Sequence, residues 1–218
     1  MSVRSPVQGR SVASLERMLS AAEEVLRTKS FDQAGVAEIA ARAGVTVGAF
    51  YARFSDKEAL LLHLEERVYA EVAELARAQA AAVSDPGVPL GTVVHGMLAA
   101  SLALYRKHGG TLRALDLRAR TDPVLRARME ATNRRTLAAF APAVLGRAGE
   151  VRHPHPAEAV RFAVLLVGNT LREATLFGTT WLEQARWDDD KLLRELTRAF
   201  LAYLGVASAS AEGTEEGG

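Results

Sequence analysis

Residues 31–62, FDQAGVAEIAARAGVTVGAFYARFSDKEALLL, are the stretch that decides the fold. Two short amphipathic segments meet there at Gly44, which can take the left-handed conformation of a tight turn. Apolar side chains line the inner face of both segments: Val36, Ile39, Ala40, Ala43, Phe50 and Phe54. Val45 follows the turn as an apolar plug, and the small Ala40 and Ala43 allow a close approach. The stretch therefore predicts a helix-turn-helix.

The face of the second segment that points away from this small core is mostly small and uncharged. We expect six residues to face a DNA duplex: Thr46, Val47, Ala49, Tyr51, Arg53 and Lys57. Small apolar side chains can read thymine methyl groups, while hydroxyls and backbone amides hold phosphates. Lys57 begins the next helix, where its charge adds to exposed amides in attracting a phosphate. An ordinary helical hairpin in a core, with Tyr51 packed and Arg53 solvated, is the plainer alternative.

These residues resemble the tetracycline-repressor (TetR) family. The segment GVTVGAFYARFSDKEALL, residues 44–61, is similar to that family's turn, recognition helix and start of the following helix. The matching positions are Gly44, Val45, Gly48, Tyr51, Phe54, Lys57, Glu58 and Leu60. The resemblance implies an all-helical dimer, a phosphate contact for Tyr51, and a larger domain that binds a small effector. It also implies repression of transcription that the effector relieves.

The sequence departs from the family pattern at several positions. Gly35 stands where the family often has Thr or Ser as a helix cap, although glycine is still an acceptable N-cap. Ser30 replaces a frequent glycine after the first helix, and Val47 and Ala49 replace commoner polar residues on the reading helix. An operator sequence therefore cannot be transferred from relatives.

The rest of the chain is also patterned as helices, so the predicted fold class is all-α: an N-terminal three-helix helix-turn-helix bundle followed by a larger helical ligand-binding and dimerisation domain. We divide the chain into a DNA-binding domain at 1–56, an effector-binding and dimerisation domain at 57–206, and a disordered tail at 207–218. Ser55 and Glu58 fit a capping box for a helix from about Lys57. Expected helices also end at Gly109-Gly110, start at Asp122-Pro123, bend or end at Pro142, and cover 157–177 and 190–204. The residues Asp188 to Asp190 are expected to cap the last of these helices.

The bulk composition excludes several classes of protein. The 218 residues carry a net charge of only +1, so DNA binding must rest on a local surface. The absence of cysteine excludes disulfides and thiolate zinc sites and suits a reducing cytoplasm. Residues 1–10 lack a signal-peptide core, and no stretch approaches the length of a membrane span. We expect no cofactor and no membrane partner.

Other functional classes have weaker support. The sequence shows no phosphate loop, nucleophile elbow or paired-histidine metal motif, so an enzyme is not expected. His153 and His155 lie in a proline-bounded stretch that is better explained as a surface loop than as a metal site. Residues 106–135 include nine basic and three acidic residues. This stretch is either a solvated face or a surface that binds an anionic effector or a partner. A helical adaptor that binds protein is a further alternative.

Two predictions concern partners. The helices at 157–177 and 190–204 are apolar on so many faces that we expect them to form a two-fold homodimer. Closing the monomer core is the alternative role. A small-molecule site is expected among apolar side chains with one polar handle: Met97, Leu98, Leu102, Tyr105, Leu137, Phe140 and Phe177. A filled core is the alternative there. The expected effector is largely apolar or aromatic, and anionic if Arg106, Arg113 and Arg118 lie nearby.

Overall fold

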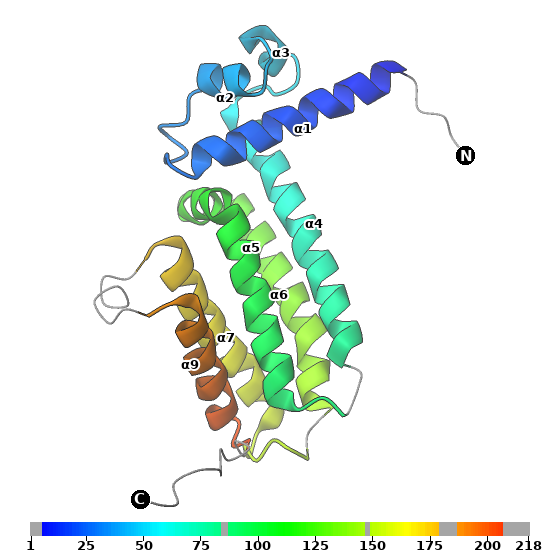
Figure 1. Ribbon diagram of the computed structural model, residues 1–218, viewed down its shortest axis with the longest axis vertical. Helices are drawn as coiled ribbons and strands as arrows, with labels where there is room; N and C mark the ends of the chain where they lie inside the picture. Colours follow the sequence, from blue (N-terminus) through cyan, green and yellow to red (C-terminus); the bar gives the residue numbers. More distant parts are fainter. Residues whose placement is uncertain (1–5, 84–86, 147–148, 179–186, 207–218) are drawn as a thin grey trace, which may run out of the picture. The chain divides into compact units, whose positions relative to one another are not determined.

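The computed structural model describes residues 6–83, 87–146, 149–178 and 187–206. Regular structure in these ranges is helical throughout and includes no strand, which confirms the all-α prediction. The helices are α1 (Pro6–Leu26), α2 (Val36–Arg42), α3 (Val47–Tyr51), α4 (Lys57–Val83), α5 (Leu90–Ala119), α6 (Pro123–Leu145), α7 (Pro156–Leu176) and α9 (Asp189–Tyr203) (Figure 1). None of the helices described is long and apolar enough to cross a bilayer. The predicted tail at 207–218 lies outside the described residues.

The chain forms two compact units, each assembled from segments that are distant in sequence. Unit 1 comprises Met1–Glu74, Ala103–Arg134 and Thr175–Phe177. Unit 2 comprises Leu75–Leu102, Arg135–Ala174 and Gly178–Gly218. Both α4 and α5 therefore contribute to both units. The functional division into 1–56, 57–206 and 207–218 stays a prediction.

The core of unit 1 joins the N-terminal helices to the second half of α5 and the start of α6. Its buried members recur at helical spacing on each element: Met18, Leu19, Ala22, Leu26, Ile39, Phe50, Phe54, Leu60, Leu64, Leu115 and Leu125. Burial of each large side chain contributes about 1.5–3 kcal/mol before entropy is counted. The helix-turn-helix is thus one wall of a continuous apolar core.

Unit 2 packs the first half of α5 with α7 and α9, and the last two helices lie side by side (Figure 1). The buried residues include Leu90, Val94, Val160, Ala163, Val167, Leu193, Leu196, Phe200 and Leu204. The Asp188 side chain accepts a hydrogen bond from the Lys191 backbone amide and caps α9, as predicted. The Arg152 backbone amide donates to the Leu204 carbonyl over 3.0 Å and ties the segment before α7 to the end of α9.

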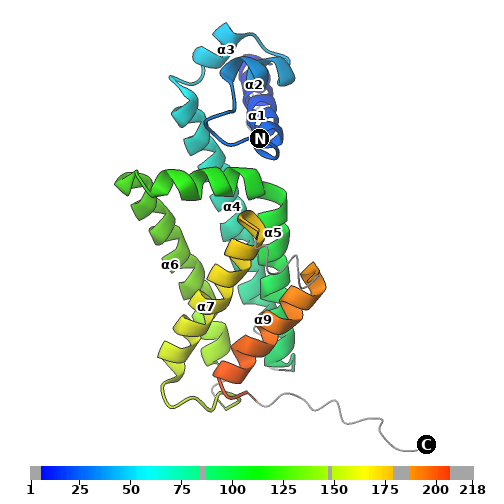
Figure 2. The ribbon, with the colours of Figure 1, turned by 90° about the vertical axis from the view of Figure 1, so that its left-hand side faces the viewer.

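The predicted helix end at Gly109-Gly110 lies beside a break in α5, where two helical segments meet at a kink. α5 continues to Ala119, and its direction changes at His108, the residue with non-helical angles (φ −110°, ψ 17°) (Figure 2). Gly110 also serves a packing purpose, because a Cβ atom at this position would overlap the backbone carbonyl of Leu26. Gly110 therefore lets α5 lie directly on the end of α1.

Two other predicted boundaries can be compared with the structure. Of the two alternatives at Pro142, a bend or an end, the end is not observed, because α6 runs on to Leu145. The cap of α4 is Asp56 and not Ser55, because Asp56 Oδ1 accepts from the Ala59 backbone amide over 2.7 Å. Asp122 caps α6 as expected, with Oδ1 accepting from the Val124 amide at 2.9 Å, one of two such bonds.

An ion pair between the buried Glu65 and the exposed Arg128 fastens α4 to α6 in unit 1. Glu65 is fully buried, and its Oε2 atom lies 2.9 Å from Nη2 of Arg128. Burial raises the pKa of Glu65 above its ordinary value, although Arg128 opposes the shift. Burial, assisted by the neighbouring Glu65 charge, also raises the pKa of Tyr69. A buried carboxylate without a partner destabilises a fold, and the guanidinium of Arg128 offsets part of this cost for Glu65.

Candidate nucleic-acid interface

The turn between α2 and α3 has the geometry that the sequence predicts. Gly44 adopts a left-handed conformation with φ 65°. The Val45 backbone amide donates to the Ala40 carbonyl over 3.0 Å, which closes the end of α2. Thr46 then caps α3, because its hydroxyl oxygen accepts from the Ala49 amide over 3.0 Å. Two caps and one glycine thus fix the angle between the two short helices.

The predicted reading face of α3 is exposed to solvent. Val47 is 41% and Tyr51 53% exposed, whereas Phe50 between them is fully buried. Thr46 and Ala49 are exposed on the same short helix. The Phe50 and Tyr51 rings meet edge to face with centroids 5.4 Å apart. The buried phenylalanine therefore anchors a surface of methyl groups and hydroxyls, which suits base edges and phosphates.

Arg53 extends this surface and is fastened to α1. Its Nη1 atom donates to the Ser11 hydroxyl over 3.0 Å, and the side chain is exposed. An arginine carries five N–H donors, so this bond leaves the guanidinium able to bind a phosphate as well. The contact also joins the residue after α3 to the N-terminal half of α1.

Lys57 lies differently from the other five predicted residues. It is half-buried, and its Nζ atom donates to the carbonyl oxygens of Phe31 at 2.7 Å and of Asp32 and Ala34 at 3.3 Å. The ammonium also sits over the Phe31 ring, 4.6 Å from its centroid. Lys57 thereby closes the loop before α2, a role that sequence reasoning missed. Its phosphate contact stays a prediction.

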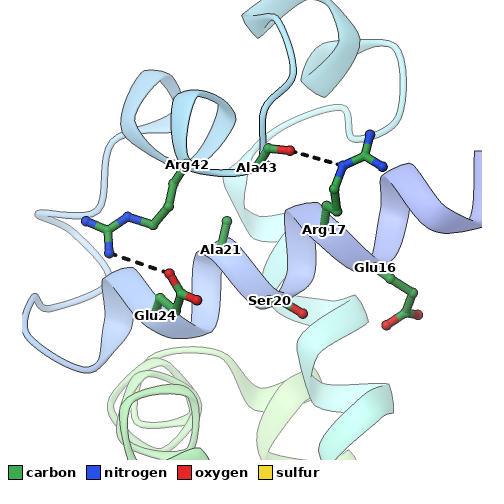
Figure 3. A pocket seen from close by; sticks show the side chains of 7 residues that line it. All are labelled: Glu16, Arg17, Ser20, Ala21, Glu24, Arg42 and Ala43. Atoms are coloured by element: carbon green, nitrogen blue, oxygen red, sulfur yellow. Dashed lines mark hydrogen bonds and ion pairs between the residues drawn. The ribbon is translucent and has the colours of Figure 1, made fainter.

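A charged groove of about 310 Å³ marks the seam between α1 and α2 (Figure 3). It is lined by Glu16, Arg17, Ser20, Ala21, Glu24, Arg42 and Ala43. Nε of Arg17 donates to the Ala43 carbonyl over 3.2 Å, and Arg42 lies 3.7 Å from Glu24. Two glutamates and two arginines leave the groove with no excess of either charge. The side chains therefore serve the contact between the two helices.

The basic stretch at 106–135 is not simply a solvated face. Several of its cations face carboxylates of α4 inside unit 1. Lys107 lies 2.7 Å from Glu71, and Arg118 lies 3.2 Å from Glu58. These pairs fasten α5 to α4.

The predicted small-molecule site stays a prediction. Met97, Leu98 and Leu102 are buried in unit 2. Tyr105 and Phe177 are half-buried in unit 1. The side chains of Leu137 and Phe140 on α6 lie outside those that the structure describes.

Comparison with known proteins identifies the N-terminal segment. Residues 18–64 match the model of the bacterial regulatory proteins of the tetR family. The match spans α2, α3 and the turn between them, with most of α1's C-terminal half and the start of α4. No curated protein matches the chain significantly.

Several solved structures share the fold along most of the chain. A TetR-family transcriptional regulator from Mesorhizobium loti is 20% identical, with 90% of this chain and 97% of that one covered and a TM-score of 0.66. A transcriptional regulator from Rhodococcus sp. Rha1 is 18% identical over 88% and 96%, with a TM-score of 0.68. FadR from Bacillus subtilis, solved in complex with stearoyl-CoA, is 18% identical over 87% and 97%, with a TM-score of 0.62.

Proposed function

We propose that the chain, whose residues 18–64 match the model of the bacterial regulatory proteins of the tetR family, is a sequence-specific regulator that binds operator DNA through α3. The observation that carries the proposal is the exposed face of α3, with Val47 and Tyr51 outward on either side of the buried Phe50. A cap at Thr46 holds this five-residue helix, and a recognition helix of this kind reads base edges in the major groove.

The chemistry of this face assigns different tasks to different side chains. Val47 and Ala49 offer methyl groups, which suit thymine and help to choose the sequence. Thr46 uses its oxygen to accept the cap hydrogen bond, so its hydroxyl proton is free for a phosphate. Tyr51 and Arg53 supply hydrogen-bond donors to the phosphates of the DNA backbone, and these contacts set the register of α3 on the duplex.

Operator binding by one short helix is weak, so we propose a two-fold homodimer in which two recognition helices reach sites about 34–36 Å apart. Its interface is the outer face of α7 with α9 in unit 2. Phe162, Leu165 and Leu166 are 45–59% exposed on α7. Tyr203 of α9 lies beside them, with its ring centroid 5.2 Å from that of Phe162. An apolar patch of this kind on a solvent face is typical of an interface.

We further propose that the protein represses transcription and leaves its operator when a small apolar effector binds. The support is the apolar character of Met97, Leu98 and Leu102, and the likeness in fold to FadR from Bacillus subtilis, which was solved with stearoyl-CoA. An effector acts only if it prefers the form that cannot bind DNA. A tenfold loss of DNA affinity requires about 1.4 kcal/mol of such preference.

The test begins with selection of duplexes from a random-sequence library by the full chain, followed by gel-shift titration of the selected duplex. We expect Tyr51→Ala and Arg53→Ala to weaken binding to every sequence. Arg53→Ala should also flatten the log–log salt dependence by about one unit. Val47→Thr should instead change which duplexes are selected.

Arg134→Ala is the matched control, because it removes one exposed arginine of unit 1 that lies far along the chain, on α6. Its affinity and salt dependence should equal those of the wild type. An enzyme or a protein-binding adaptor would select no common sequence. Unchanged affinity in both Tyr51→Ala and Arg53→Ala would exclude α3 as the reading helix.

A further inference from the structure

A chain of charged side chains crosses α1, α4 and α5 inside unit 1, with His108 at its centre. The His108 side chain is 1% exposed, with Nδ1 2.9 Å from Glu23 of α1 and Nε2 3.1 Å from Glu71 of α4. Each carboxylate has a second partner, Arg67 at 3.6 Å from Glu23 and Lys107 at 2.7 Å from Glu71. The chain reads Glu16, Arg67, Glu23, His108, Glu71, Lys107, with charges that alternate when His108 is protonated. We call Glu23, His108 and Glu71 the clasp.

The clasp requires a proton on both ring nitrogens of His108. A neutral imidazole has one donor and one acceptor, so one carboxylate would face a lone pair at about 3 Å. The hydrogen bond to Glu23 raises the pKa of His108, and the bond to Glu71 adds to this effect against burial. Burial raises the pKa of Glu71, but its bonds with Lys107 and His108 outweigh burial and the pKa lies below its ordinary value.

His108 is the member of this chain whose charge can change near neutral pH. The other members of the chain are carboxylates, an arginine and a lysine: Glu16 and Glu23 on α1, Arg67 and Glu71 on α4, and Lys107 on α5. Carboxylates ordinarily titrate near pH 4 and the lysine and arginine above pH 10, whereas an imidazole titrates at about 6.5. The clasp therefore opens when one proton leaves His108.

The clasp holds α1, the helix against which the helix-turn-helix packs. Three contacts described above run from α1 to the reading elements: Arg17 to Ala43, Glu24 to Arg42 and Ser11 to Arg53. Gly110 rests on the backbone of Leu26 at the other end of α1. The position of α1 against α4 and α5 thus determines where α3 points relative to α4.

We propose that His108, as an imidazolium, is a positioning residue for DNA binding: it fastens α1 to α4, and loss of its proton releases this hold and weakens operator affinity. The inference rests on the proposed function and adds a control that the function does not require. The two hydrogen-bond partners of His108, Glu23 and Glu71, are not among the residues predicted to face DNA, so its effect passes through α1.

The first experiment asks whether the clasp is charged. The chemical shifts of the imidazole nitrogens are followed by NMR in the full chain from about pH 6 to about pH 9. This range includes the ordinary pKa of an imidazole and extends well above it. The His108 signals are assigned by their absence in His108→Gln. We expect two protonated ring nitrogens at neutral pH and a midpoint above the ordinary imidazole value. A single protonated nitrogen at pH 6 would overturn the proposal.

The second experiment measures the Kd for a duplex that the wild-type protein selects from a random library at about pH 6.5. At pH values above the midpoint of His108, the wild-type Kd should rise with pH. The slope should be at most about tenfold per pH unit for each His108 that loses its proton. His108→Gln should bind more weakly at low pH and show a flat profile. His95→Gln should retain the wild-type profile. Circular dichroism at each pH confirms that the protein is folded.

Glu71→Gln separates positioning from mere structural support. The carboxamide nitrogen of the new side chain can donate to a neutral imidazole, while Glu23 still accepts from the other ring nitrogen. This variant should therefore bind DNA tightly with little dependence on pH.

The outcomes distinguish the inference from the function on which it rests. A wild-type protein that selects no duplex would overturn the proposed function and this inference with it. A selected duplex with equal pH profiles for wild type and His108→Gln would overturn this inference alone. The same holds if Glu71→Gln keeps the full pH dependence.

Discussion

The Nε atom of Arg17 donates a hydrogen bond to the carbonyl oxygen of Ala43, 3.2 Å away across the seam of α1 and α2. Ala43 is the last residue before Gly44, and carbonyls at a helix end lack a partner within the helix. A cation at the C-terminal end of a helix also interacts favourably with the negative end of the helix dipole. One side chain of α1 thus completes the turn that sets the direction of α3.

Loss of this bond should loosen the turn without removing the fold. We expect Arg17→Ala to lower the free energy of unfolding by about 1 kcal/mol, the contribution of one partly exposed hydrogen bond. Equilibrium urea unfolding followed by circular dichroism measures the difference. Arg42→Ala is the control. It breaks two long surface ion pairs, with Glu24 at 3.7 Å and with Glu38 at 3.8 Å, and should change stability by less than about 0.5 kcal/mol. Equal losses in both variants would contradict this role for Arg17.

Sequence reasoning succeeded where the signals are local. Gly44 has the predicted positive φ, and Asp122 and Asp188 cap the helices that follow them. Phe50 and Phe54 are buried at the spacing that the pattern predicts. Each of these features depends on residues within one or two turns of each other, so the order of residues suffices to predict it.

Features that depend on distant partners could not be predicted in this way. His108 meets Glu23 across 85 residues of sequence, and nothing in either local pattern pairs them. The glycine pair beside it predicts a helix end, but the sequence does not reveal that Leu26 packs on Gly110. The sequence assigns Lys57 to DNA alone, because its carbonyl partners lie more than 20 residues earlier.

The two adjacent glycines of α5 should respond in opposite ways to the same change. Gly110→Ala places a methyl group on the Leu26 carbonyl, a backbone atom that cannot move aside, and should cost about 1–3 kcal/mol of stability. Gly109→Ala meets only the Leu176 side chain at 3.8 Å and should stabilise the helix by about 0.5–1 kcal/mol. Thermal unfolding of both variants supplies the comparison. A neutral Gly110→Ala would show that α5 does not rest on α1.

Lys57 should prove to be a structural residue whatever its contact with DNA. Lys57→Ala leaves the carbonyls of Phe31, Asp32 and Ala34 without their common donor, and we expect a loss of about 1–2 kcal/mol in urea unfolding. Lys29→Ala is the control, since Lys29 makes a surface ion pair with Glu38 and should contribute less than about 1 kcal/mol. Identical stability of the two variants would mean that the three carbonyls do not depend on Lys57.

The exposed apolar face of α7 should decide the state of assembly. Leu165 is 59% exposed between Phe162 and Leu166, so a charge at its position costs the monomer little. In a dimer the same charge would be buried without a partner, which is expensive. We expect the wild type to sediment as a dimer at micromolar concentration and Leu165→Glu to sediment as a folded monomer. Val124→Glu, at an apolar residue of unit 1 that is 70% exposed, should remain dimeric. A wild type that is monomeric yet binds a palindromic duplex tightly would refute the dimer, because two half-sites would then be read without the α7 face.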